Sequence, residues 1–321
     1  MRIMCVLVSV FTILAGYEFG FAQTLHVINI ADTRKDTDNY EGFAANFESV
    51  RAFANKVAKS TNMHISWTEI KGNDYNCEII KSKVEALSAG TDDVIIFYYS
   101  GHGQSPKTNA NDTTASKFPS FQCDDPEHPS PVGDLPNLEA ISTLLRGKHA
   151  RLTISVADSC NKLPIEFLQP KAYGPPVKRP PVDRLKTLFL DFQGYALLTS
   201  SSPDEFSYYS PTDNVGFFTQ QLLENLQKPM PGVRDANVWS EALARSMTEI
   251  VIANPPAHQH PLSDANLFYQ PRAANAARSG TMSELAATQE SGKMAPATEK
   301  RYPKKKKKLH HHRKPTNANS G

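Results

Sequence analysis

Two residues that could carry out nucleophilic catalysis follow strand-like apolar runs. His102 stands in Ser-Gly-His-Gly directly after VIIFYY, and Cys160 stands in Asp-Ser-Cys-Asn directly after LTISVA. A thiolate is a strong nucleophile toward an amide carbonyl, and a nearby imidazole favours the thiolate and protonates the departing amine. The pair therefore predicts cysteine-based hydrolysis of amide bonds.

The residues around this pair suit the same chemistry. The backbone N–H groups of Gly103 and Cys160 could form an oxyanion hole, in which losing one donor costs about 3–4 kcal/mol of barrier lowering. Gly101 also removes side-chain bulk beside the imidazole. Taken singly, such a histidine is more often a satisfied polar residue and such a cysteine a small buried hydrophobe. A serine hydrolase using Ser100 or Ser159 would lack the Gly-x-Ser-x-Gly elbow.

Strand-like and helix-like segments alternate along the chain and predict how the pair is positioned. Apolar runs predict strands over 25–31, 63–70, 94–99, 152–157, 195–200 and 267–269, and helical spacing predicts helices over 40–59, 77–87, 138–145, 217–226 and 238–252. This alternation favours an open, largely parallel α/β sheet covered by helices. Because the carboxyl ends of parallel strands meet at one edge, His102 and Cys160 should be neighbours there.

The two motifs together resemble those of the caspase-like cysteine peptidases, and most closely their metacaspase and bacterial caspase-family branch. The later stretch YALLTSSSPDE at 195–205, followed by Gly216-Phe-Phe-Thr219, resembles the small-subunit portion of that family. The resemblance covers about residues 25–269. It implies a caspase-like three-layer sandwich, with a mostly parallel six-stranded sheet flanked by helices, and His102 and Cys160 as the catalytic dyad.

The resemblance also implies a substrate pocket. In the metacaspase branch, the acidic residue two before the cysteine, here Asp158, lines the pocket for the substrate residue that precedes the cut bond, and Ser100 borders it. A carboxylate in a partly dry pocket favours Arg or Lys. Metacaspases usually add a second pocket Asp near the start of the first helix. Here Asn46 lies near that place, with Asp36 and Asp38 earlier in the loop.

The sequence departs from the family pattern at two further points. Asn161 follows the cysteine, where metacaspases commonly carry His, and Arg34 is the one nearby candidate for the basic pocket of animal caspases. These departures leave an alternative open, in which the chain is a caspase-like module that binds a peptide or protein partner and no longer cuts.

The chain divides into three parts. Residues 1–22 are expected to be a cleaved signal peptide, because Arg2 precedes an uncharged stretch and small residues precede Gln23. Residues 23–271 form the peptidase domain, which contains a Pro-rich linker at 164–186, and residues 272–321 form a disordered polybasic tail. The protein is therefore expected to be secreted or periplasmic. The alternative is an uncleaved anchor or a buried first helix.

The Pro-rich linker suits a processing site. In the caspase-like family the chain between the cysteine and the next strand is often cut during activation. The linker offers several basic residues for self-cleavage: Lys171, Lys178, Arg179, Arg184 and Lys186. Exposed linkers commonly contain such residues without being cut, so self-cleavage is a hypothesis.

The cysteine count bears on which thiol is free. Cys5 would leave with the signal peptide, so the mature chain keeps Cys77, Cys123 and Cys160. An odd number in an oxidising compartment leaves at least one unpaired within the chain. Cys77 and Cys123 could pair and leave Cys160 free, or both could be reduced.

No organic cofactor is predicted, and the metal signals are weak. His258 with His260, and the cluster His310–His312, lack the ligand spacing of a structural zinc site. Calcium activation is possible through Asp124, Asp125 and Glu127, but no ligand loop is legible there.

Charge and hydropathy limit the other partners. The tail carries 12 Lys/Arg and 3 Asp/Glu, which gives it +9 against −7 for residues 23–271. It could bind anionic surfaces weakly and in a salt-dependent way, without specific nucleic-acid recognition, or simply be solvated. The apolar run of the first segment has 13 residues, short of the roughly 20 that span a bilayer as a helix. The main partner expected is therefore a peptide or protein substrate.

Overall fold

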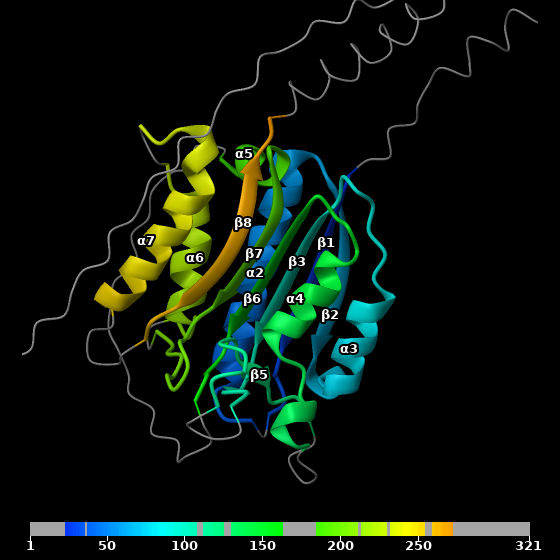
Figure 1. Cartoon of the computed structure of the whole chain (residues 1–321), viewed down its shortest axis with the longest axis vertical. Helices are drawn as coiled ribbons and strands as arrows, with labels where there is room; N and C mark the ends of the chain where they lie inside the picture. The colour runs from blue at the N-terminus through cyan, green and yellow to red at the C-terminus, as the bar shows by residue number, and fades with distance from the viewer. Residues whose placement is uncertain are drawn as a thin grey trace, which may run out of the picture. The chain divides into compact units, whose positions relative to one another are not determined.

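A six-stranded sheet lies at the centre of the computed structural model, which describes residues 23–35, 37–107, 112–124, 130–162, 184–210, 213–229, 232–253 and 259–271 (Figure 1). Its first five strands are parallel, and the last is antiparallel to its neighbour. In spatial order they are β2 (His64–Lys71), β1 (Thr24–Ala31), β3 (Val94–Ser100), β6 (Leu152–Asp158), β7 (Phe192–Thr199) and β8 (Leu262–Tyr269). The predicted mostly parallel sheet is confirmed.

The two central strands are buried along their whole length. Every residue of β3 and of β6 is buried, as expected for continuous apolar runs covered on both faces. Because side chains alternate along a strand, Val94, Ile96 and Tyr98 enter one core, whereas Ile95, Phe97 and Tyr99 enter the other. These strands therefore give the loops that follow them a rigid base.

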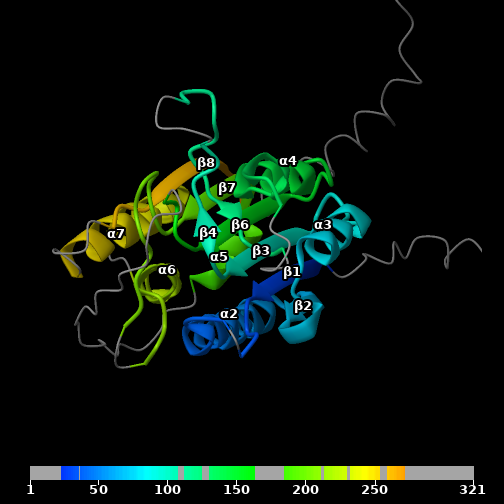
Figure 2. The same ribbon diagram turned by 90° about the horizontal axis from the view of Figure 1, so that it is seen from below.

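Helices cover both faces of the sheet and complete the three layers (Figure 2). One core contains residues of α2 (Tyr40–Thr61), α5 (Leu185–Leu190), α6 (Phe217–Gln227) and α7 (Val238–Ala253). The other contains residues of α3 (Cys77–Ala86) and α4 (Leu138–Arg146). The Asn76 and Asn137 side chains cap α3 and α4 by accepting from the backbone N–H three residues on. Short 3-10 helices are η2 (Gly72–Asp74), η3 (Val132–Asp134) and η4 (Asp235–Asn237).

Some elements differ from the expectation. Helix α5 begins at Leu185, so the last two residues of the expected linker 164–186 belong to a helix that the sequence did not predict. Two short antiparallel strands that the sequence did not predict, β4 (Gly103–Gln104) and β5 (Ser120–Phe121), lie beyond the end of β3. The last strand has eight residues, not three, because it pairs with β7 along its full length.

The expected signal peptide, most of the linker and the basic tail lie outside the described residues. Within the part of the chain that the structure describes, no helix is both long and apolar enough to cross a membrane.

Candidate active site

The loops that carry His102 and Cys160 meet at the carboxyl edge of the sheet. Ser100, at the end of β3, lies directly opposite Asp158, at the end of β6. Beyond these strands the loops touch, since the Ser105 N–H donates to the Lys162 carbonyl at 3.1 Å. The expected meeting of the two loops at one edge is therefore confirmed.

Gly103 marks the closest approach of the two loops. A Cβ atom added there would lie 2.5 Å from the carbonyl oxygen of Cys160 and 2.7 Å from Oγ of Ser159. Real Cβ atoms essentially never come within 3.0 Å of such atoms, so only glycine allows this contact. The residue after the histidine thus packs directly on the main chain of the cysteine.

The His102 imidazole is held by contacts from the first turn of α2 and from the segment before that helix. Its ring packs edge-on against Phe43, with 5.2 Å between ring centroids. The backbone of Asp38 hydrogen-bonds the ring. Burial lowers the pKa of His102, and the charges of Asp32 and Asp38 oppose that shift only in part. The imidazole is therefore neutral near pH 7 and able to accept a proton.

The Cys160 thiol lies in an environment that opposes ionisation. The backbone N–H of Ser207 donates to Sγ at 3.5 Å. Burial nevertheless raises the pKa of Cys160 to about 11, and the nearby Asp158 adds to that effect. The resting states are thus a thiol at Cys160 and a neutral imidazole at His102.

The pH dependence of alkylation tests this protonation state. With the pKa of Cys160 at about 11, the thiolate fraction rises about tenfold per pH unit from pH 7 to pH 9. We expect the second-order rate of iodoacetamide alkylation of Cys160 to rise in the same proportion, measured by peptide mass spectrometry with Cys160→Ala as the blank. A rate already level between pH 6 and pH 9 would instead indicate a preformed thiolate–imidazolium pair.

The expected pocket carboxylate is fully buried and already hydrogen-bonded. Asp158 has no exposed surface. Its carboxylate accepts hydrogen bonds from the hydroxyls of Ser207 and Thr219, each at 2.6 Å, and from Nδ2 of Asn46 at 3.2 Å. Burial raises the pKa of Asp158, although the hydrogen bonds from Ser207 and Thr219 counteract it. A basic substrate side chain could reach this carboxylate only by displacing some of these donors.

Asn46 lies in the place where the resemblance implied a second acid. Its Nδ2 lies 3.0 Å from Oγ of Ser100, and its Oδ1 accepts the Gly216 N–H at 2.7 Å. A Cβ on Gly216 would lie 2.1 Å from Oδ2 of Asp158. Asn46 thus joins Ser100, Asp158 and the start of α6 into one buried polar cluster. Of the two earlier acids, Asp38 contacts His102, whereas Asp36 lies outside the described residues.

Sequence reasoning assigned no role to several residues of this site. Ser207 and Thr219 contact Asp158 from segments 49 and 61 residues further along the chain. The motif Gly216-Phe-Phe-Thr219 supported the family resemblance, and its conspicuous Thr219 was the available signal. Nothing in the sequence pointed to Ser207 or to Phe43.

Asn161 fixes the cysteine loop to two neighbouring segments. Its N–H donates to the Glu205 carbonyl at 2.9 Å, and its Nδ2 donates to the Lys117 carbonyl at 2.8 Å. Glu205 in turn pairs with His260, with 2.6 Å between Oε1 and Nδ1. Asn161, at the position where metacaspases commonly carry His, therefore anchors the cysteine loop to the neighbouring segments.

Cys77 and Cys123 form a disulfide, while Cys160 is the free cysteine of the described chain. The pairing alternative is therefore confirmed. Arg34, the candidate for a basic pocket, forms a bidentate ion pair with the buried Asp32, with both N–O distances at 2.8 Å. Its charge is thereby neutralised by its own chain.

The candidate metal residues are only partly described. His258, His310–His312, Asp125 and Glu127 lie outside the described residues, and Asp124 accepts the Ser130 N–H. Among the residues that are described, no group of three or more His, Cys, Asp or Glu is arranged to hold a metal ion.

A sheet that brings a histidine loop and a cysteine loop together in this way defines a caspase-like peptidase. The family model of the caspase domain matches residues 27–251, and the chain belongs to that family. Membership supports cysteine peptidase activity in general terms. No curated protein matches the chain in sequence.

Several solved structures are similar to this chain. Caspase-1 from Spodoptera frugiperda is 13% identical, with 76% of this chain and 86% of that chain covered and a TM-score of 0.42. The Drosophila initiator caspase Dronc is 12% identical, with 75% and 78% covered and a TM-score of 0.40. A protein from Geobacter sulfurreducens is 15% identical, with 75% and 93% covered and a TM-score of 0.40. The family assignment rests on the sequence match.

Proposed function

We propose that this protein is a secreted cysteine endopeptidase that hydrolyses peptide bonds with a Cys160–His102 dyad. The observation that carries the proposal is the contact of Gly103 with the main chain of Cys160, where a Cβ would come within 2.5 Å of the carbonyl oxygen. This contact brings the loops of the two reactive side chains together on two fully buried strands. A rigid base of this kind is what nucleophilic catalysis requires.

The proposed reaction has two halves. The sulfur of Cys160 attacks the substrate carbonyl while His102 takes the thiol proton, and the amides of Gly103 and Cys160 stabilise the oxyanion. His102 then gives its proton to the leaving amine as the C–N bond breaks, which leaves a thioester. Water, deprotonated by His102, hydrolyses the thioester and restores the thiol.

We propose cleavage after Arg or Lys, with Asp158 as the acid beneath the pocket and Ser100 at its border. The acidic side chain at this position supports the proposal, because a carboxylate shielded from water attracts a cation strongly. The Asp158 carboxylate already accepts hydrogen bonds from Ser207, Thr219 and Asn46, and a substrate cation that binds it would have to replace some of them. The attraction between the substrate cation and the carboxylate therefore has to exceed the stabilisation that the displaced donors provide.

Export is supported by the expected signal segment 1–22 and by the Cys77–Cys123 disulfide, since disulfides persist in oxidising compartments. The proposed partners are peptide or protein substrates. The basic tail at 272–321 could add weak, salt-dependent contact with anionic surfaces.

A panel of fluorogenic peptides ending in Arg, Lys or Asp tests the proposal, with a thiol reductant and with and without calcium. We expect hydrolysis after Arg and Lys at least about tenfold faster than after Asp, abolished by iodoacetamide but not by a fluorophosphonate. Hydrolysis after Asp alone would keep the dyad and overturn the pocket. A correctly folded protein that is silent with every peptide would favour the non-cutting module instead.

A further inference from the structure

We propose that Tyr99 is a positioning residue for His102 and that Tyr75 and the Cys77–Cys123 disulfide brace it. This inference rests on the proposed function, because it concerns how the proposed general acid/base is held. Tyr99 has no exposed surface, and Tyr75 is 2% exposed. Both therefore act on the main chain behind the imidazole, without touching a substrate.

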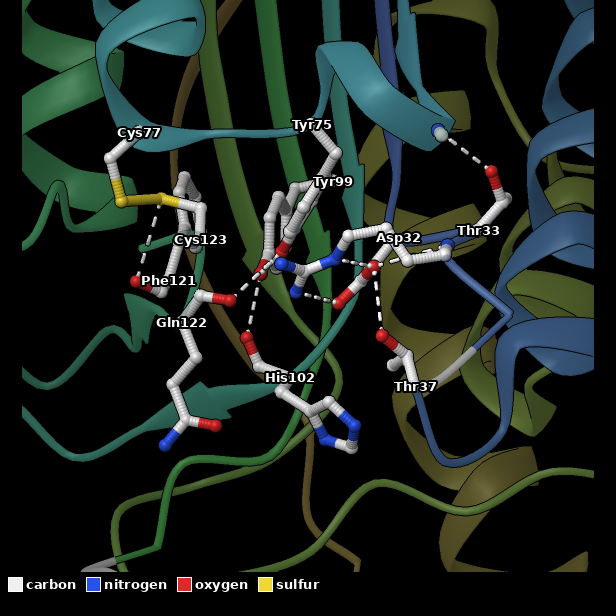
Figure 3. A network of polar contacts seen from close by, with 12 residues as sticks. Asp32, Thr33, Thr37, Tyr75, Cys77, Tyr99, His102, Phe121, Gln122 and Cys123 are labelled. Carbon is white, nitrogen blue, oxygen red and sulfur yellow. Dashed lines mark hydrogen bonds and ion pairs between the residues drawn. A yellow bond between two sulfur atoms is a disulfide. The ribbon is translucent and has the colours of Figure 1, made fainter. Parts of the chain in front are cut away.

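The main chain of His102 is held by two donors, of which Figure 3 shows the Tyr99 hydroxyl. The Tyr99 hydroxyl donates to the His102 carbonyl oxygen at 2.6 Å, and the Gln122 N–H donates to the same oxygen at 3.0 Å. The imidazole points away from the tyrosine pair. Two donors on one carbonyl oxygen fix the peptide unit from which the imidazole projects.

The positions of the two tyrosine hydroxyl protons determine which group donates in each hydrogen bond. The Tyr75 and Tyr99 oxygens lie 2.6 Å apart, and the Tyr75 oxygen also lies 3.1 Å from the Gln122 carbonyl. Two phenol protons thus face three contacts. The two short contacts are satisfied together if Tyr75 donates to the Tyr99 oxygen and Tyr99 donates to the His102 carbonyl. Neither phenol proton is then directed at the longest contact, which joins the Tyr75 oxygen to the Gln122 carbonyl. Burial raises the pKa of both tyrosines, so both protons stay in place.

The glycine before the histidine fits this pair closely. A Cβ on Gly101 would lie 2.8 Å from the hydroxyl oxygens of both Tyr75 and Tyr99. The hydroxyl pair thus occupies the space that any other residue would need. The close fit makes the position of the His102 peptide unit depend directly on the two hydroxyls.

The disulfide joins the two segments whose residues hold the main chain of His102 in place. Cys77 lies two residues after Tyr75, and Cys123 directly follows Gln122. The Cys77 N–H also donates to the Cys123 carbonyl at 2.9 Å. The covalent link therefore restrains the separation of the main-chain segments that carry Tyr75 and Gln122. Tyr75 contacts the Tyr99 hydroxyl, and Gln122 contacts the His102 carbonyl.

Kinetics of Tyr99→Phe and Tyr75→Phe test the proposal. We expect Tyr99→Phe to lower kcat about tenfold with KM within about twofold of the wild type, because only the Gln122 N–H then holds the His102 carbonyl. Tyr75→Phe should have a smaller effect in the same direction. Tyr195→Phe is the matched control. Its hydroxyl donates to the Asp264 carboxylate in an exposed contact in the middle of β7, so the substitution should leave both constants unchanged.

Hydrogen exchange in the full chain separates this inference from the proposed function. In a Cys160→Ala background, which rules out self-cleavage by the proposed nucleophile, Tyr99→Phe should reduce the protection of the Gln122 amide about tenfold and leave the β1 and β2 amides unchanged. If the wild type cuts but kcat of Tyr99→Phe stays within twofold, the inference is overturned. If the wild type does not cut, the proposed function fails, and the Gln122 amide decides the inference: lost protection supports the brace, and unchanged protection overturns it.

Discussion

We expect Gly103→Ala to lower kcat/KM by about a hundredfold or more while the protein still folds. The new methyl group would lie 2.5 Å from the Cys160 carbonyl oxygen and 2.8 Å from Cβ of Ser159, and neither atom is the end of a flexible side chain. The histidine and cysteine loops would have to separate by part of an ångström. Catalysis depends steeply on such distances, and the Gly103 amide would leave its place in the proposed oxyanion hole.

The control for this prediction is Gly133→Ala. Gly133 has no atom within 4 Å of its virtual Cβ, so the same change of residue type should leave kcat/KM unaltered. The two variants are compared by peptide hydrolysis and by thermal unfolding. Wild-type activity in a folded Gly103→Ala protein would mean that the contact between the two loops is not needed for the reaction.

The second large effect is expected from the reactive residues themselves. Cys160→Ala should lower kcat by about 10⁴-fold or more, because no other group supplies the nucleophile. His102→Ala should lower kcat by about 10²- to 10⁴-fold, which is the usual contribution of a general acid/base. The double variant should be no worse than Cys160→Ala alone, since the two groups act as a unit. Peptide hydrolysis at a single pH measures all three.

Two comparisons make this result specific. Ser159→Ala should retain hydrolysis that iodoacetamide still abolishes, and loss of all activity there would revive a serine mechanism. In pure Cys160→Ala protein, the linker at 164–186 should stay uncut on a gel. If the wild-type protein is cut in this linker and pure Cys160→Ala protein is cut at the same place, self-processing is ruled out.

The sequence predicted the frame of the site because strand signals are local. The buried strands β3 and β6 are uninterrupted apolar runs, and their parallel direction follows from the alternation with helices. Once both strands are parallel neighbours, the loops with His102 and Cys160 must leave from one edge. This part of the site needs no knowledge of side-chain packing.

The surroundings of the pocket could not be predicted in the same way. The donors to Asp158 come from Asn46, Ser207 and Thr219, which are 112, 49 and 61 residues away in the chain. Hydroxyl and amide side chains of this kind are common everywhere, and only the tertiary fold selects these three. The family resemblance therefore implied an acidic pocket residue at Asp158, but not that its carboxylate is already hydrogen-bonded within the chain.

The contacts that hold the main chain of His102 also could not be predicted from the sequence. Tyr99 lies in a run that reads only as a buried strand, and its hydroxyl becomes meaningful when Tyr75 and the His102 carbonyl meet it. Helix α5 was missed for a related reason, because six residues are too few to establish a helical period. Both features depend on what packs against them.

Covalent trapping tests the central claim most directly, namely that Cys160 is a nucleophile assisted by His102. The full chain is treated with an electrophilic peptide ketone ending in Arg, and the adduct is located by peptide mass spectrometry. The account predicts one equivalent bound to Cys160, loss of hydrolysis in proportion to labelling, and much slower labelling in His102→Ala. Labelling at another residue, or undiminished labelling in Cys160→Ala, would contradict it.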